Sequence, residues 1–128
     1  MVRLLFVCVG NTCRSQMAEG IARDLGHVAA SAGTHASESS RVAKYAIEVL
    51  EEIGIDTNGL HPKEIDAVYP ANYDAIISMG CGVSCPSLPI DDDWGLEDPH
   101  GGGREVYRKT RDKIRELVSN LVEGFTDA

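Results

Sequence analysis

Three residues near the start of the chain have the types and spacing needed for nucleophilic attack on an anion. Five residues separate Cys8 from Arg14, and Ser15 follows the arginine. The apolar run Leu4-Leu5-Phe6-Val7 precedes the cysteine, and a helix-like segment, 16–22, follows the serine. This order predicts a buried strand that ends at the cysteine, then a tight loop, then a helix that begins at the arginine and serine.

The predicted loop has the stereochemistry of an oxyanion site. So short a loop must curl, which points successive backbone N–H groups at a common centre, and the helix adds its positive end there. The planar guanidinium of Arg14 can hold two oxygens of a tetrahedral oxyanion. These positive partners are expected to lower the pKa of the Cys8 thiol and activate it as a nucleophile. The expected oxyanion-binding residues are Val9, Gly10, Asn11, Thr12, Cys13, Arg14 and Ser15.

Either loop cysteine also suits a purely structural role, because cysteine is often buried as a small apolar residue. The position of Cys8 between strand and loop favours the nucleophile. Cys13 is expected to pack inward without a catalytic role.

Length, charge and cysteine content limit the classes of protein that remain. The chain has 128 residues, a formal net charge of -8 and four cysteines. This length suits a single domain over 1–128 that folds without disulfides or metal ions. The negative charge argues against binding to nucleic acid or an anionic membrane, and no apolar stretch reaches transmembrane length. Without a signal-peptide pattern, we expect a cytoplasmic monomer whose reduced cysteines serve catalysis or metal binding.

Hydrophobic periodicity predicts strands that alternate with helices along the rest of the chain. We expect a strand at 27–32, a helix through 42–53 capped within 37–40, a short helix at 63–68 with Pro62 in its first turn, a strand at 73–79 and a helix at 104–122. The arginine row of this last helix, Arg104, Arg108, Arg111 and Arg115, is interpreted as a solvated face.

The alternation predicts an α/β fold, in which a parallel sheet carries helices on both faces. Ligands of such sheets bind beyond the carboxyl ends of the strands. Cys8 and Cys81 each follow a predicted strand, so both are expected at this edge. If their strands are close, Cys81 can reach Cys8.

The sequence Cys8-Val-Gly-Asn-Thr-Cys-Arg-Ser-Gln-Met-Ala-Glu19 resembles the phosphate-binding loop of two related families. These are the low-molecular-weight protein tyrosine phosphatases and the thioredoxin-coupled arsenate reductases that share their fold. The resemblance implies a four-stranded parallel sheet, with a short fourth strand near 89–93. It also implies that Asp98, which precedes Pro99, is a general acid, although an aspartate before proline is equally common in turns.

Cys81 and Cys85 favour the reductase, because a phosphatase has no use for this second pair. The resemblance implies that Cys8 attacks arsenate, Cys81 attacks the Cys8 adduct and releases arsenite, and Cys85 then forms a disulfide with Cys81 for thioredoxin to reduce. The predicted function is cytoplasmic arsenate reduction, a detoxification that gives arsenic resistance, with phosphate or sulfate as mimics of arsenate. The phosphatases usually carry an aromatic pair after the aspartate and a proline at position 16. His100-Gly-Gly-Gly103 and Gln16 stand there instead.

Two alternatives stay open. A low-molecular-weight phosphatase would hydrolyse phosphomonoesters through a phosphocysteine at Cys8. A non-enzymatic redox or metal-responsive binding protein would use Cys81 and Cys85, although no second cysteine pair with zinc-site spacing is present.

The spacing of Cys81 and Cys85 departs from that of the best-known reductases. Those reductases separate the two cysteines by six residues, whereas only Gly82-Val83-Ser84 intervene here. A disulfide therefore requires a turn or helical loop that brings the two Cα atoms within about 7 Å.

The resemblance also implies a potassium ion beside the loop, since some reductases of this family bind one. The matching residues are Asn11, Glu19, Ser31 and Glu64, the last where an aspartate is typical. Asn11 is more directly expected to hold the loop through side-chain hydrogen bonds. Glu19 equally suits a solvated helix position. No other cofactor is expected to bind tightly.

Overall fold

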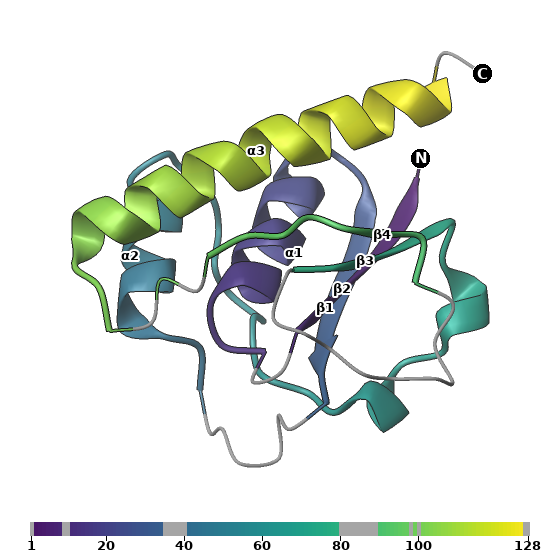
Figure 1. Cartoon of the computed structure of the whole chain (residues 1–128), viewed down its shortest axis with the longest axis horizontal. Coiled ribbons are helices and arrows are strands. Elements are labelled where there is room, and N and C mark those ends of the chain that lie inside the picture. The colour runs from purple at the N-terminus through teal and green to yellow at the C-terminus, as the bar shows by residue number, and fades with distance from the viewer. Residues whose placement is uncertain are drawn as a thin grey trace.

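The computed structural model describes residues 2–8, 11–34, 41–79, 90–97, 99 and 101–126. Within these ranges a parallel sheet has the strand order β2-β1-β3-β4 (Figure 1). The strands are β1 (Arg3–Cys8), β2 (Val28–Gly33), β3 (Ala75–Ser78) and β4 (Asp92–Asp93). The α-helices are α1 (Arg14–Asp24), α2 (Lys44–Glu51) and α3 (Arg104–Thr126), and the short 3-10 helices are η2 (Ile65–Ala67) and η3 (Pro70–Asn72). None of these helices is both long and apolar enough to cross a bilayer.

β1 occupies the centre of the sheet, as its composition predicts. Only Arg3 is exposed, and the five residues after it are buried. A strand covered on both faces needs such a continuous apolar run. β1 pairs with β2 on one side and β3 on the other, and Cys8 lies opposite Gly33 at the end of the ladder. The sheet therefore fixes the backbone of Cys8 from both sides.

The side chains of β1 alternate between two cores of unequal size. Leu4, Phe6 and Cys8 belong to the large core that includes residues of α1, α2 and α3. Leu5 and Val7 belong to a smaller cluster on the other face. The partly buried residues that cover this cluster include two from the η2 region, Ile65 and Val68. The four-stranded parallel fold is confirmed, but within the described residues the second face carries a 3-10 helix instead of an α-helix.

The predicted short helix at 63–68 is present as the 3-10 helix η2, but its predicted start is wrong. Glu64 has extended backbone at the N-cap of η2, so Pro62 does not form a helical first turn. Long-range bonds hold this segment extended: Glu64 pairs with Gly33 in an isolated bridge, and the Lys63 carbonyl accepts the Gly33 N–H at 2.9 Å. Tertiary pairing beside β2 thus overrides the local helical signal. The predicted fourth strand is present as β4, which pairs with β3, while residue 89 lies outside the described residues.

The predicted cap for α2 within 37–40 is also wrong. Those residues lie outside the described part, and the N-cap of α2 is Ala43, which gives no side-chain cap. The N–H of Ala43 donates instead to the carbonyl of Thr12 at 2.9 Å. The start of α2 is therefore tied directly to the predicted oxyanion loop.

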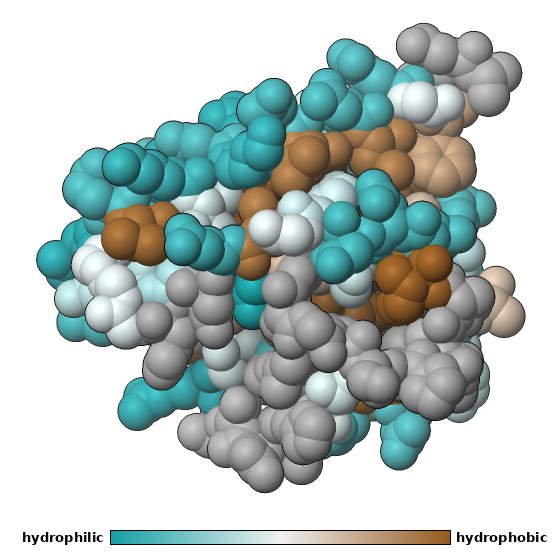
Figure 2. Space-filling model, in the orientation of Figure 1, coloured by the Kyte–Doolittle hydropathy of each residue, from teal (hydrophilic) through white to brown (hydrophobic). Residues whose placement is uncertain are grey.

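The arginine row of α3 is only partly solvated, because it forms the contact with α2. Arg111 is 8% exposed and donates to the carbonyl of Val49 at 2.9 Å. Hydrogen bonds from Arg104 and Arg108 hold the pKa values of Glu48 and Glu52 below their ordinary range. The interpretation of the row as a solvated face is thus wrong for Arg111. In Figure 2 the outer surface of α3 is mostly hydrophilic, as expected for its other side.

Candidate active site

Cys8 lies at the carboxyl end of β1, 4% exposed, with two polar groups against its sulfur. The backbone N–H of Asn11 donates to Cys8 Sγ at 3.0 Å. The hydroxyl oxygen of Ser15, on the first turn of α1, lies 2.8 Å from the same sulfur. Both contacts stabilise a thiolate, because a charged acceptor strengthens the hydrogen bonds that it receives.

The direction of the Ser15 contact is determined when Cys8 is ionised. Nδ2 of Asn11 donates to Ser15 Oγ at 2.8 Å. A thiolate can only accept, so the Ser15 hydroxyl then donates a hydrogen bond to Cys8 while its oxygen accepts from Asn11. This arrangement leaves the Ser15 hydroxyl satisfied on both sides when Cys8 is ionised.

Removal of the Ser15 hydroxyl is expected to raise the pKa of Cys8. Ser15→Ala deletes a hydrogen bond to the thiolate, and such bonds contribute about 1.5–3 kcal/mol. Alkylation of Cys8 by iodoacetamide at pH 7 should slow about tenfold and recover at higher pH, as measured by mass spectrometry of the modified peptide. Ser119→Ala, on α3, is the matched control. An unchanged pH profile in Ser15→Ala would rule out this role.

Arg14 begins α1 and is 6% exposed. Its Nη1 donates to two carbonyls, that of Met79 at 3.1 Å and that of Leu96 at 2.6 Å. Met79 directly follows β3, and Leu96 precedes position 98 by two residues. These bonds orient one edge of the guanidinium against the backbone. The guanidinium is thereby held against the backbone just after β3 and at Leu96.

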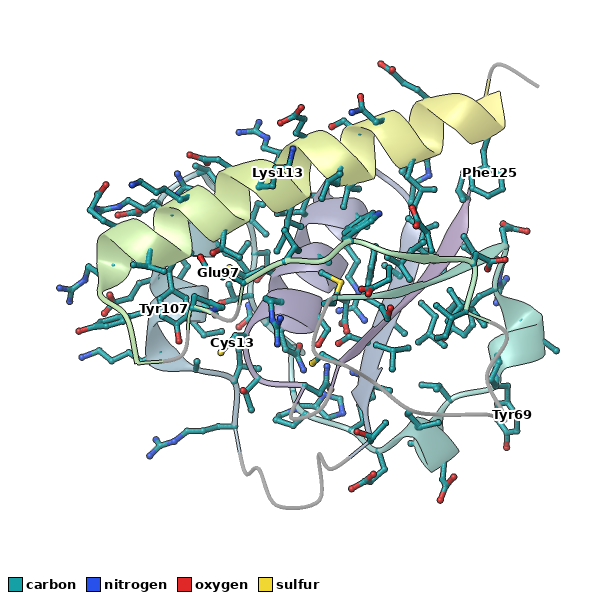
Figure 3. All side chains as sticks on the ribbon, viewed as in Figure 1. Cys13, Tyr69, Glu97, Tyr107, Lys113 and Phe125 are labelled. Atoms are coloured by element: carbon teal, nitrogen blue, oxygen red, sulfur yellow. The ribbon has the colours of Figure 1, made fainter. Side chains whose placement is uncertain are left out.

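The N-terminus of α1 is suited to receive an anion. Cys13 is its N-cap and forms no side-chain capping hydrogen bond to the helix, and the first turn contains no acidic residue. The positive end of the helix dipole is therefore neither capped by a side chain nor neutralised by a carboxylate. The Cys13 sulfur lies 3.5 Å from the hydroxyl of Tyr107 on α3, and Figure 3 shows the two labelled residues close together. Cys13 is 5% exposed and packs inward, as expected.

Asn11 forms several hydrogen bonds within the loop, and its backbone has a conformation that L-residues rarely adopt. Its φ is 56°, in the left-handed region, where asparagine is tolerated better than most side chains. Its Oδ1 accepts the N–H of Lys63 at 2.8 Å and Nε2 of Gln16 at 3.1 Å. Gln16 also donates to the carbonyls of Asn11 and His61, at 2.9 and 2.8 Å. These bonds hold the left-handed turn that places the Asn11 N–H against Cys8.

Gln16 and Lys63 are structural partners of the loop that the sequence did not reveal. The sequence distinguishes Gln16 only as a departure from proline, and it predicts Lys63 to lie in a short helix. The structure places both against Asn11, and only the proximity of Gln16 to the loop in sequence offered a signal. No local pattern indicates Lys63, because 52 positions separate it from Asn11.

The structure brings together part of the predicted site. Asn11, Arg14 and Ser15 lie at the end of β1 around Cys8 as described above, and Thr12 contributes its carbonyl to the start of α2. The remaining predicted residues, Val9, Gly10, Cys81, Cys85 and Asp98, lie outside the described residues. Among the residues that the structure does describe, no group of three or more His, Cys, Asp and Glu side chains could hold a metal ion.

The site joins a buried thiol at the end of a central parallel strand to an arginine at the start of the next helix, an arrangement of an α/β protein that could hold an anion beside the sulfur. The chain belongs to the low molecular weight phosphotyrosine protein phosphatase family, whose profile matches residues 3–127. The family predicted from the loop sequence is thereby confirmed.

The similar proteins include both arsenate reductases and a tyrosine phosphatase. The chain is 43% identical over 127 residues to the glutaredoxin arsenate reductase of Synechocystis sp., with 95% of this chain and 97% of that protein covered. A solved structure described as an arsenate reductase in the phosphate binding state is 42% identical, with a TM-score of 0.87 and coverage of 97% and 98% of the two chains. The low molecular weight protein tyrosine phosphatase from T. tengcongensis is 36% identical, with a TM-score of 0.81 and coverage of 97% and 99%.

Proposed function

We propose that this chain is an arsenate reductase. The observation that carries the proposal is the environment of Cys8, whose sulfur accepts a hydrogen bond from the Asn11 N–H and lies 2.8 Å from the Ser15 hydroxyl beside the start of α1. A thiolate stabilised in this way is a nucleophile aimed at a tetrahedral oxyanion. Relatives that carry the name arsenate reductase at 42–43% identity, over nearly the whole chain, support arsenate as this oxyanion.

The proposed reaction moves two electrons from cysteine sulfur to arsenic. The Cys8 thiolate attacks arsenic, and a protonated oxygen leaves as water, which gives an arsenate ester on sulfur. The Cys81 thiolate then attacks the Cys8 sulfur; the S–As bond breaks, its electron pair stays on arsenic, and arsenite is released. Cys85 attacks Cys81 and frees Cys8 as a thiolate, so the oxidised product is a Cys81–Cys85 disulfide. Asp98 is proposed as the acid that protonates the leaving oxygen.

The sheet supports an encounter between Cys8 and Cys81. The N–H of Met79 donates to the carbonyl of Val7 at 3.1 Å, so the chain just after β3 lies beside the residue that precedes Cys8. Cys81 follows Met79 by two residues, and two residues of chain span at most about 7 Å. This reach is sufficient for a thiol at position 81 to approach the end of β1.

A weak phosphatase activity is the second candidate. Arsenate and phosphate have nearly the same shape, and a phosphatase of this family is 36% identical to this chain. Attack of Cys8 on a phosphomonoester requires the same loop, Arg14 and a general acid. We propose that this activity is residual, because the sequence replaces the usual aromatic pair after Asp98 with His100-Gly-Gly-Gly103.

Thioredoxin is the reductant that we propose, in the cytoplasm, where thiol reductants are maintained. The Synechocystis relative carries glutaredoxin in its name, so the glutathione system is the direct competitor. Both reductants attack an accessible disulfide by thiol exchange.

One coupled assay tests the reaction and its reductant. Arsenate-dependent NADPH oxidation is measured with thioredoxin and thioredoxin reductase, and in parallel with glutaredoxin, glutathione and glutathione reductase. We expect turnover with thioredoxin that is lost in Cys81→Ser and Cys85→Ser. Turnover only in the second system would assign glutaredoxin instead. Full multiple turnover in Cys85→Ser would contradict the relay, and aryl phosphate hydrolysis without arsenate turnover would make the chain a phosphatase.

A further inference from the structure

A buried carboxylate beside the oxyanion loop is paired with a lysine from a distant segment. Glu19 on α1 is fully buried. Its Oε1 accepts the hydroxyl of Ser31 at 2.7 Å and lies 3.3 Å from Nζ of Lys63. The same ammonium donates to the carbonyl of His61 at 3.2 Å. Arg23 Nη2 lies 2.7 Å from the other carboxylate oxygen, in an ion pair that is not aligned as a hydrogen bond.

The potassium ion implied by the family resemblance does not fit these residues. Potassium needs several oxygens with lone pairs directed at one point, but the Lys63 ammonium already lies against Glu19 Oε1. Oδ1 of Asn11 accepts two N–H groups, from Lys63 and Gln16. The single charge of Glu19 also faces two cations, Lys63 and Arg23, so a third would add repulsion at a buried position. Glu19 is fully buried, so the alternative that it is a solvated helix residue is wrong.

We propose that the ammonium group of Lys63 is a built-in monovalent cation that replaces potassium beside the nucleophile loop. An ammonium group carries the same charge as a potassium ion. The nitrogen-to-oxygen distances of its hydrogen bonds are similar to the potassium-to-oxygen distances in a potassium site. The Lys63 side chain is 17% exposed, which shields the pair from water and from competing ions. A buried carboxylate without such a partner is strongly disfavoured, and the covalently attached cation is present at any salt concentration.

Lys63 is also connected to Cys8 by a short chain of hydrogen bonds. Its backbone N–H donates to Oδ1 of Asn11 at 2.8 Å, Nδ2 of Asn11 donates to Ser15, and Ser15 contacts Cys8. The ammonium fixes the side chain of Lys63 on Glu19, while the backbone of the same residue orients Asn11. Lys63 is therefore a positioning residue, which acts on the nucleophile through Asn11 and Ser15.

Chemical rescue tests this assignment without arsenate, so its outcome is independent of the proposed function. In the wild type, Tm is expected to differ by less than about 1 °C between potassium chloride and tetramethylammonium chloride at equal ionic strength. Lys63→Ala should lower Tm by about 5–10 °C and slow the alkylation of Cys8. Potassium or ammonium chloride at about 100 mM should recover roughly half of both losses, because either ion fits the space that the lysine leaves. Tetramethylammonium should recover neither.

Two further variants keep the test decisive. Lys113→Ala removes an exposed lysine from α3 (Figure 3) and should show no cation-specific rescue. If Lys63→Ala does not fold, Lys63→Met is combined with Glu19→Gln in a double-mutant cycle by urea unfolding. Lys63→Met should then cost much less stability in the Glu19→Gln background. Equal costs in both backgrounds, potassium-specific stabilisation of the wild type, or no rescue by small cations would each overturn the proposal.

Discussion

Cys8→Ser is expected to abolish arsenate reduction while it leaves the oxyanion loop intact. The substitution exchanges one atom, and the Asn11 N–H and the Ser15 hydroxyl remain to hold the new side chain. A serine hydroxyl ionises far less readily than a thiol, and oxygen cannot form the disulfide with Cys81 that the proposed reaction requires. Arsenate-dependent NADPH oxidation should therefore fall by at least about 10³-fold. Phosphate affinity, measured by calorimetry, should stay within about threefold because the loop and Arg14 are unchanged.

Cys13→Ser is the matched control for this experiment. Cys13 is a second buried thiol of the same loop, but its sulfur faces the Tyr107 hydroxyl instead of the contacts of Cys8. Its replacement should leave arsenate turnover within about threefold of the wild type. Loss of activity in Cys13→Ser comparable to that in Cys8→Ser, or more than about 0.1% residual activity in Cys8→Ser, would contradict the assignment of the nucleophile.

Arg14→Lys is expected to have the next largest effect, although it conserves charge. Lysine is a point charge without a planar fork, so it cannot both bind two oxyanion oxygens and hold the backbone. Charged hydrogen bonds of this kind contribute about 1.5–3 kcal/mol each. The dissociation constant for phosphate should rise about 30- to 100-fold, and kcat/KM for arsenate should fall by at least about 100-fold.

The same substitution also reports on the backbone contacts of Arg14. The Met79 carbonyl keeps a bond from the Leu96 N–H at 3.2 Å, whereas the Leu96 carbonyl loses its 2.6 Å contact with Nη1. A drop in Tm of a few degrees is expected beside the loss of affinity. Arg115→Lys, on the exposed side of α3, should change neither quantity. Wild-type phosphate affinity in Arg14→Lys would show that the guanidinium does not bind the oxyanion.

The sequence predicted those parts of the fold and site that depend on local patterns. The apolar run before Cys8 predicted a buried strand, and β1 is buried from Leu4 to Cys8. The short interval from Cys8 to Arg14 predicted a curled loop before a helix, and the observed contacts of Asn11 and Ser15 with the sulfur agree with it. These features are predictable because residues a few positions apart are held together by the chain itself.

The parts that failed depend on partners far away in sequence. The segment 63–68 has helical character by itself, but its bonds to Asn11 and Gly33 keep Lys63 and Glu64 extended. Glu19 has the charge expected of a solvated helix residue, and its contacts with Ser31 and Lys63, beside its ion pair with Arg23, explain how it is buried. Contacts between residues far apart in the sequence produce no periodic pattern of residue types, so the sequence does not predict them. The roles of Cys81, Cys85 and Asp98 stay predictions, because these residues lie outside the described part of the chain.

The central position of β1 also determines which partner would move in the proposed thiol exchange. Its backbone is bonded to β2 and β3 on its two sides, and its side chains are packed on both faces. Amide protons in such a strand exchange with solvent chiefly when the whole domain unfolds, so β1 belongs to the slowest-exchanging part of the molecule. The backbone of Cys8 is thus held in place by its neighbouring strands. Any sulfur that attacks it, whether from this chain or from a reductant, has to make the approach.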